Sequence, residues 1–317
     1  LDYVSNGDGV ISLQVKEGGA APDWLMQLSL SDADLRRRSD AEAYIQEVDL
    51  QLKALVEDVT FDRERARKFA LEFRIPSARV TDMSVFNAYL PPDSPLQITG
   101  GEAQLGADIL LHHDDADGWV RLESSGIEVL ADQQSLQADL GVEILIVDGV
   151  PADMAFDVTG SRIVLDKVRV KGGKDQFEEE DWSGVLTLTR GDTVFTNPLE
   201  LNLDATLEMS DSRPIVALFR NQEGWRPEFI ANMMTTEDIA GTASMNMANN
   251  RIEIPEARVI SDKMEAGMKA VIESENRNGV IYLRYKKLDA LLKIKDGKKN
   301  LDLIKVKEKY DDYQLID

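Results

Sequence analysis

The 317-residue sequence predicts a mainly β protein, built from a long antiparallel sheet of consecutive strands with a few short helices. The main observation is that apolar and polar residues alternate over many short segments. Such strands are apolar on one face and polar on the other, which is typical of antiparallel sheets, because buried parallel strands are apolar on both faces. In addition, turn-forming residues separate the alternating segments, and few segments carry a helical pattern.

The alternation continues through most of the chain. In the first quarter it is carried by four sets of apolar residues: Ile11, Leu13 and Val15; Trp24, Met26, Leu28 and Leu30; Val48, Leu50, Leu52 and Ala54; Phe69, Leu71, Phe73 and Ile75. The later sets are clearer: Leu136, Ala138, Leu140, Val142, Ile144 and Ile146; Leu199, Leu201, Leu203, Ala205, Leu207 and Met209; Met264, Ala266, Met268, Ala270 and Ile272; Ile281, Leu283 and Tyr285. Each set lies on one face of its predicted strand, because side chains alternate in direction along a strand.

Turns are predicted where Gly, Asn and Asp cluster. The signals are Asn6-Gly7-Asp8-Gly9, Asp117-Gly118, Asp148-Gly149, Gly172-Gly173, Asn249-Asn250 and Asn278-Gly279. These residue pairs favour the tight turns of β-hairpins, so they indicate that the predicted strands follow one another as a meander.

Helices are predicted in three places. The segment 32–46 is rich in charge and suits a short helix, and Ser84 to Leu90 suits one or two turns before two prolines. The segment 213–235 suits a helical hairpin, with Pro214 in its first turn and a break at Gly224 and Pro227. We expect this hairpin to cover one end of the sheet.

Three regions follow from these patterns. Residues 1–70 hold N-terminal strands and the short helix, 71–285 a repetitive antiparallel sheet with the helical hairpin, and 286–317 a basic C-terminal segment. The run from Ile75 to Val80 (IPSARV) is echoed from Ile254 to Val259 (IPEARV), which favours a sheet of similar strands. The chain starts at Leu1, inside a pattern, so we expect that a signal or membrane anchor precedes it.

The charge is large and unevenly distributed. The formal net charge is -22, and an acidic surface repels phosphate backbones, so nucleic acid is not an expected partner. However, residues 284–309 hold ten Lys or Arg and four acids, a net +6, which leaves the rest of the chain at -28. This basic segment suits either a solvated helix or edge strand, or contact with anionic lipid or an acidic partner.

Catalytic chemistry is not indicated. The chain has no cysteine, and its two histidines are adjacent, within the segment from His112 to Gly118. Neighbouring side chains on a strand point to opposite faces, so we interpret this segment as a polar hairpin turn and not as a metal site. The motifs of serine hydrolases, phosphate-binding loops and zinc proteases are missing from the sequence. We therefore predict no enzyme activity, no metal and no cofactor.

One stretch resembles a known family. A strand at Ile75–Val80 is followed by Asp82–Pro91, with a helical turn and a Leu-Pro pair, and then by a strand that starts at Gly100-Gly101. This order resembles the AsmA-like family of TamB-related proteins, and the resemblance spans roughly residues 70–285. The basic segment 284–309 has no place in the family pattern.

The resemblance implies a fold, a location and a function. Members are anchored in the inner membrane of Gram-negative bacteria by an N-terminal helix, and their bodies lie in the periplasm. Their sheets curl into a long groove with an apolar interior, which carries phospholipids in outer membrane biogenesis. The family has no catalytic residues to transfer to this sequence.

The sequence leaves two arrangements open: an open groove, or a sandwich-like closed core. If the groove is open, its lining is expected on the strongest alternating faces, at Leu136, Leu140, Ile144, Leu199, Leu203, Leu207, Met264 and Met268. The expected ligand is then a phospholipid or another acyl-chain lipid, because each buried methylene stabilises binding by about 0.8 kcal/mol. A closed core instead suits a structural or protein-interaction module of the cell envelope, which docks another envelope protein at a strand edge without lipid.

Overall fold

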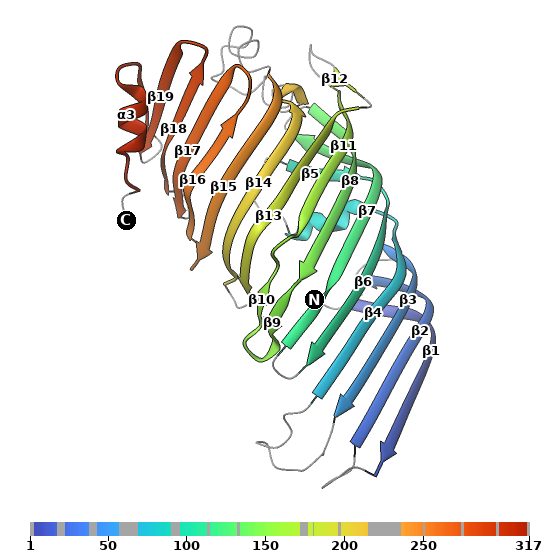
Figure 1. The fold of residues 1–317 in the computed structure, drawn as a ribbon. Coiled ribbons are helices and arrows are strands. Elements are labelled where there is room, and N and C mark those ends of the chain that lie inside the picture. The colour runs from blue at the N-terminus through green and yellow to red at the C-terminus, as the bar shows by residue number, and fades with distance from the viewer. Residues whose placement is uncertain are drawn as a thin grey trace. The chain divides into compact units, whose positions relative to one another are not determined.

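The computed structural model describes most of the chain. The described residues are 3–17, 23–37, 43–56, 69–89, 96–112, 115–131, 134–171, 177–179, 181–195, 198–214, 236–249, 251–273, 276–295 and 298–315. Most of them belong to strands that pair antiparallel with their neighbours, in sheets that do not close on themselves (Figure 1). The predicted fold class, mainly β with consecutive antiparallel strands and a few short helices, is confirmed.

The chain forms two compact units. Unit 1 comprises residues 1–132 and 137–161, and unit 2 comprises residues 133–136 and 162–317. The three regions drawn from the sequence, with boundaries at 70/71 and 285/286, stay a prediction, and neither boundary coincides with the division between the units.

Unit 1 is a meander with one inserted strand. Its elements are β1 (Tyr3–Lys16), β2 (Asp23–Arg37), β3 (Ile45–Val56), β4 (Phe69–Val80), η1 (Met83–Tyr89), β5 (Leu96–Gly100), β6 (Ala103–His112), β7 (Asp115–Ala131), most of β8 (Gln134–Ile146), β9 (Asp148–Val150), η2 (Pro151–Asp153) and β10 (Ala155–Asp157). Strand β4 pairs directly with β6, because β5 pairs with the far end of β7. Asn87 joins η1 to β5, since its amide donates to Ile98 O (2.7 Å) and accepts from Ile98 N (2.8 Å).

Unit 2 continues the same construction. Its elements are β11 (Arg162–Lys171), β12 (Phe177–Glu178), β13 (Ser183–Val194), β14 (Glu200–Asp211), β15 (Glu237–Ala248), β16 (Arg251–Ile260), β17 (Met264–Glu273), β18 (Asn276–Tyr285), β19 (Leu288–Lys295), β20 (Lys298–Asp302) and the helix α3 (Val306–Asp311). From β13 to β20, each strand pairs antiparallel with the next.

The repeated Ile-Pro motif has a structural role. The register of β4 against β6 shifts between Ile75 and Ala78, and that of β16 against β17 shifts between Ile254 and Ala257. Both shifts fall at the proline of the motif. Proline has no N–H to donate to a ladder and is tolerated at bulges, so the motif sets a β-bulge at the same place in both units.

Two of the three helix predictions meet described residues. The turn predicted at Ser84–Leu90 is confirmed as η1. The helix predicted over 32–46 is wrong, because Asp32–Arg37 belongs to β2 and Ile45–Gln46 to β3. Asp32 has a positive φ of 49°, and the register shifts on both sides of Ala33, so an irregular strand interrupted the alternation and imitated helical spacing. The hairpin predicted at 213–235 lies outside the described residues beyond Pro214. No helix in the described part of the chain is long and apolar enough to span a membrane.

Several predicted turns lie inside strands. Asn6–Gly9, Asp117-Gly118, Asp148-Gly149 and Asn278-Gly279 belong to β1, β7, β9 and β18, so these predictions are wrong. Asn249 is a turn residue between β15 and β16, as predicted, and Gly172-Gly173 lies outside the described residues. In the histidine segment, His112 of β6 pairs with Asp115 of β7, so this hairpin closes ahead of Asp117-Gly118.

The strand glycines allow close approach of backbones. A Cβ on Gly118 would lie 2.2 Å from Asp108 O, and one on Gly279 would lie 2.5 Å from Lys269 O. Gly118 also has a φ of +149°, which side chains rarely adopt. In these two strands, the glycine within an alternating segment marks close strand pairing and not a reversal of the chain.

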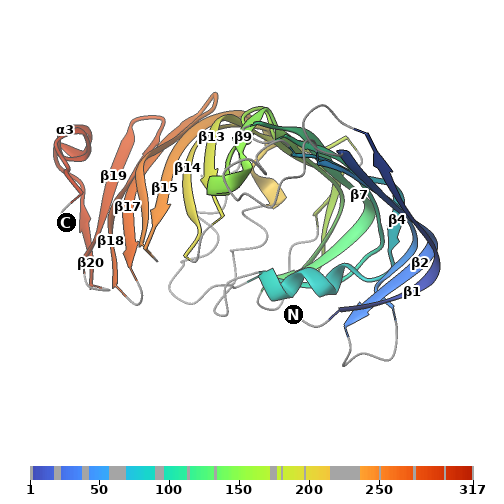
Figure 2. The same ribbon diagram turned by 90° about the horizontal axis from the view of Figure 1, so that it is seen from below.

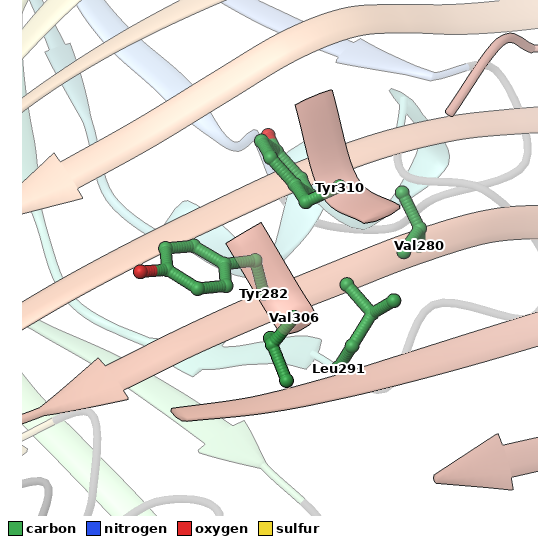
Figure 3. Close-up of a cluster of buried hydrophobic side chains, with 5 residues drawn as sticks. All are labelled: Val280, Tyr282, Leu291, Val306 and Tyr310. Carbon is green, nitrogen blue, oxygen red and sulfur yellow. The ribbon is translucent and has the colours of Figure 1, made fainter. Parts of the chain in front are cut away.

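The basic C-terminal segment forms β19, β20 and α3, and α3 packs against β18 and β19. Val306 and Tyr310 of α3 contact Val280, Tyr282 and Leu291, and all five side chains are buried (Figure 3). The rings of Tyr282 and Tyr310 lie 5.4 Å apart. This cluster is a small hydrophobic core on one face of β18 and β19.

Neighbouring strands shape the seat of α3. Gly267 lies opposite Tyr282, and a Cβ there would lie 2.6 Å from the Tyr310 hydroxyl. Lys269 Nζ donates to the carbonyl oxygens of Tyr310, Asp311 and Tyr313 at 3.2, 3.3 and 3.2 Å, which satisfies the end of the helix. Burial alone raises the pKa of Glu265, but hydrogen bonds from Lys307 and Arg258 outweigh it and lower that pKa overall.

We expect Gly118→Ala to lower the free energy of unfolding by about 2 kcal/mol or more, because the methyl group meets backbone atoms at an unfavourable φ. Gly100→Ala is the matched control, since its Cβ would meet only the Glu128 carboxylate, at 3.4 Å. Urea unfolding followed by circular dichroism measures both variants. Equal stability of the two variants would contradict the close pairing of β6 and β7.

We expect Tyr282→Phe to leave stability at pH 7 almost unchanged, because the buried Tyr282 hydroxyl has no hydrogen-bond partner among the described residues. Burial, with the charges of Asp289 and Glu265, raises the pKa of Tyr282 to about 12, whereas an unfolded tyrosine ionises near pH 10. The stability due to this shift is present below pH 10 and is lost as the pH rises through 12. Urea unfolding from pH 7 to 11.5 should therefore show a shallower loss for Tyr282→Phe; a parallel loss would contradict the assignment.

Candidate functional site

The strand registers bring apolar side chains of unit 1 onto one face. Residues directly opposite each other in an antiparallel pair project to the same side. The pairings join one row across five strands: Ile11, Leu28, Leu52, Phe73 and Ile109. The alternation seen in single strands is therefore in phase between strands, and it creates a continuous apolar face.

The opposite face of unit 1 is polar. Arg74 forms ion pairs with Glu72 (2.9 Å) and Asp108 (3.0 Å), and Lys53 lies 3.6 Å from Glu72. The hydrogen bond and charge of Asp108, followed by the charge of Glu72, raise the pKa of Arg74. A depression of about 310 Å³ on β2–β4 is lined by Lys53, Glu72 and Arg74, by the polar residues Gln27, Ser29 and Gln51, and by Leu28 and Leu52. Its charged groups are paired with one another within the fold.

Unit 2 carries a longer apolar row. Its directly paired residues, taken from β13 to β20, are Leu188, Ala205, Ala243, Ala257, Met268, Ile281, Leu292 and Leu301. No residue of the row is charged or polar. The core around α3 lies on the other face, because Tyr282 and Leu291 alternate with Ile281 and Leu292 along their strands.

Neither row is sealed from solvent along its length. In unit 1, Leu28, Leu52 and Phe73 are half-buried, and Ile11 is 73% exposed. In unit 2, Leu188 and Met268 are half-buried, whereas Ile281 is 37% and Leu301 63% exposed. Side chains between two packed layers are normally buried, so a closed two-layer core does not describe these positions.

Each apolar face is covered at one end. In unit 1, Ala78, Val80 and Ala103 of this face are almost fully buried, as is Met83 at the start of η1, which lies beside this part of the sheet (Figure 2). In unit 2, the Trp182 ring lies against Gly184, where a Cβ would be 2.7 Å from the ring, and Trp182 Nε1 donates to Asp211 O at 3.0 Å. Buried residues therefore mark one end of the strands on each face, and partly exposed residues lie along the two rows.

The candidate residues fall into two groups. Leu203, Leu207, Met264 and Met268 lie on the apolar face of unit 2; Met264 is 8% exposed and the other three are half-buried. Leu136, Leu140 and Ile144 share one side of β8, with Ile144 36% exposed, and Leu199 directly precedes β14. The structure therefore places four of the eight candidates on one continuous surface.

The prediction omitted the small residues of the row. Ala205, Ala243 and Ala257 are paired with one another across β14, β15 and β16, and Ala205 has Leu203 and Leu207 on either side along its strand. Ala205 was visible in the alternation of its strand, but its alignment with the other two alanines depends on register. A single strand sequence carries no signal for that register.

The polar groups near the two ends of the segment 213–235 are satisfied by one another. Ser212 N donates to Thr236 O, and Thr236 N donates to Ser212 Oγ, both at 3.0 Å. Thr236 Oγ1 lies 2.6 Å from Ser261 Oγ and donates to Asp262 at 2.7 Å, and this bond from Thr236 lowers the pKa of Asp262. We interpret the cluster as a structural junction. Within the described ranges, no group of three His, Cys, Asp or Glu residues is placed to hold a metal ion.

Comparison of the chain with family models, with curated proteins and with solved structures found no match. The resemblance to the AsmA-like family therefore stays a prediction, and the apolar faces of the two units are the structural basis for a proposed function.

Proposed function

We propose that this chain is a non-catalytic, AsmA-like periplasmic segment that binds or conducts phospholipid acyl chains between the inner and outer membranes. The observation that supports this proposal is the row from Leu188 to Leu301, which crosses unit 2 without a polar residue and is half-buried or exposed at its large side chains. A surface of this kind offers burial to an apolar ligand and no directional polar contacts.

The chemistry suits an alkyl chain. Each methylene that leaves water contributes about 0.8 kcal/mol, so several methylenes on this face give useful affinity without a hydrogen bond. Ala205, Ala243 and Ala257 lie side by side with larger residues on either side along β14, namely Leu203 and Leu207. We infer that the small alanine side chains form a shallow channel in the apolar face, which runs across the strands between the larger side chains. Because no polar group fixes the ligand, an acyl chain can shift along this path at low cost.

The proposed cellular setting follows from the family resemblance. In this setting the protein serves envelope biogenesis in Gram-negative bacteria, and an N-terminal anchor in the full-length protein holds it to the inner membrane. Catalysis has no part in the proposal, because lipid transfer along an apolar face requires burial and release and no bond to be broken.

An alternative function is an interaction module of the cell envelope that does not bind lipid. It is favoured by β1, which pairs along its length with β2 and forms the outer strand of unit 1 (Figure 1). Val10 and Ile11 of this strand are 70% and 73% exposed. A long apolar edge strand is a template for strand addition by another protein. This alternative predicts a cross-linked partner at β1 and no bound lipid.

Extraction of the purified protein with organic solvent, followed by mass spectrometry, tests the proposal. We expect phospholipid close to one molecule per protein, eluting with the folded protein in gel filtration. A protein that stays free of lipid, also after incubation with phospholipid vesicles, would contradict the proposal and support the interaction module.

We expect Leu203→Asp to reduce bound lipid at least about tenfold while the protein stays folded, because a carboxylate on the apolar face opposes burial of methylenes. The matched control is Asn202→Asp, which places a carboxylate on the polar face of the same strand, near Arg190. Leu140→Asp makes the same test on β8. Lipid is measured by mass spectrometry and folding by circular dichroism; loss of the fold in both leucine variants would instead identify these positions as core.

A further inference from the structure

The lysines at the C-terminal end of unit 2 differ in their partners. Lys307 and Lys309 of α3 form ion pairs with Glu265 and Asp302. The lysines at the two ends of β19 and at the start of β20 are exposed, and no described carboxylate pairs with them: Lys287, Lys295, Lys298 and Lys299. Several arginines elsewhere in the units, such as Arg74 and Arg121, have acidic partners on their own sheet.

Large apolar side chains accompany the unpaired lysines. Leu288 and Leu301 are 61% and 63% exposed, and Leu303 and Ile304, which follow β20 directly, are 66% and 71% exposed. Leu288 pairs with Tyr285, and Leu301 pairs with Leu292. Three exposed leucines and one exposed isoleucine thus lie within one strand of the lysines.

These residues share one edge of unit 2. Strand β20 is five residues long and pairs with β19, and Figure 2 shows β19, β20 and α3 together at the C-terminal end of the unit. The ion pair of Lys309 with Asp302 and the packing of Val306 hold the chain that leaves β20 against the sheet. We call the residues 286–288, 295, 298, 299 and 301–304 the C-terminal edge.

Protection of an edge strand does not account for this composition. Lysines on a short edge strand discourage the addition of another strand. Exposed Leu and Ile side chains beside the lysines have the opposite effect, because apolar surface is unfavourable in water and favours association. Lysines together with exposed apolar side chains are instead the composition of a surface that lies on a membrane, where the amines meet anionic headgroups and the apolar groups enter the interface.

We propose that the C-terminal edge docks on the surface of an anionic lipid bilayer. Charge complementarity selects this occupant and its orientation. Residues 284–309 carry a net +6, whereas the remaining chain carries -28 and is repelled by the same surface. Its charge therefore favours the approach of this end of the chain to an anionic membrane. The inference goes beyond acyl-chain binding and does not depend on it, because its ligand is an intact bilayer surface.

Sedimentation with vesicles tests this inference on the whole chain. We expect binding to vesicles of phosphatidylglycerol and phosphatidylcholine in equal parts, binding at least about tenfold weaker to phosphatidylcholine alone, and loss of binding in high salt. The triple variant Lys295→Gln, Lys298→Gln and Lys299→Gln should bind the anionic vesicles at least about tenfold more weakly. Leu303→Ser with Ile304→Ser, both outside the apolar row, should weaken binding without changing its dependence on salt.

The matched control replaces three exposed lysines outside the edge: Lys16→Gln, Lys53→Gln and Lys171→Gln. It changes the net charge equally and should leave binding within about twofold. An equal loss in both triple variants would overturn the proposal, as would the absence of binding to anionic vesicles at low salt. Binding to polyglutamate with no binding to vesicles would also overturn it, in favour of an acidic protein partner. Acyl-chain binding is measured separately, as lipid extracted from the purified protein. A protein that keeps its bound lipid but does not sediment with anionic vesicles would contradict membrane docking alone.

Discussion

The phase of side chains between neighbouring strands is the constraint on which the rest of this structure depends. A slip of one residue in any pairing would turn the apolar residues of a strand towards the polar face. The pairings keep Met268 opposite Ile281 and Leu292 opposite Leu301, so that one surface stays apolar across many strands. Ion pairs such as that of Arg74 with Asp108 lie on the other face for the same reason.

Bulges at the Ile-Pro motifs preserve this phase. Between Ile254 and Ala257 the register shifts, yet Ile254 and Ala257 both pair with residues of the apolar face, Ala270 and Met268. The motif therefore absorbs an extra residue without reversing the faces. A bulge also increases the local twist of the strands, so the two copies of the motif alter the path of each sheet at an equivalent point.

Much of the fold could be predicted from the sequence, because alternation is a property of one strand at a time. The failures arose where the structure departs from regular strands. Asp32 and Ala33 form an irregular part of β2 that imitated a helix, and Gly118 and Gly279 permit close backbones where turns were expected. Half of the candidate lining was placed on one surface, at Leu203, Leu207, Met264 and Met268, but the contribution of Ala243 and Ala257 depends on long-range register. The packing of α3 was not predicted, although Val280, Tyr282 and Leu291 give β18 and β19 apolar residues on their second face as well, a pattern that indicates a covered face.

The contact of α3 with Gly267 has an evolutionary consequence. The Tyr310 ring occupies the space in which any side chain at position 267 would begin. Neither position can therefore change freely while the other is kept. In related sequences that retain this helix, we expect glycine at 267 wherever 310 is a large aromatic residue, and a larger residue at 267 only where 310 is small. A pair of sites so far apart in the chain would then vary together, with lineages preserving the fit of the pair and not the identity of either residue.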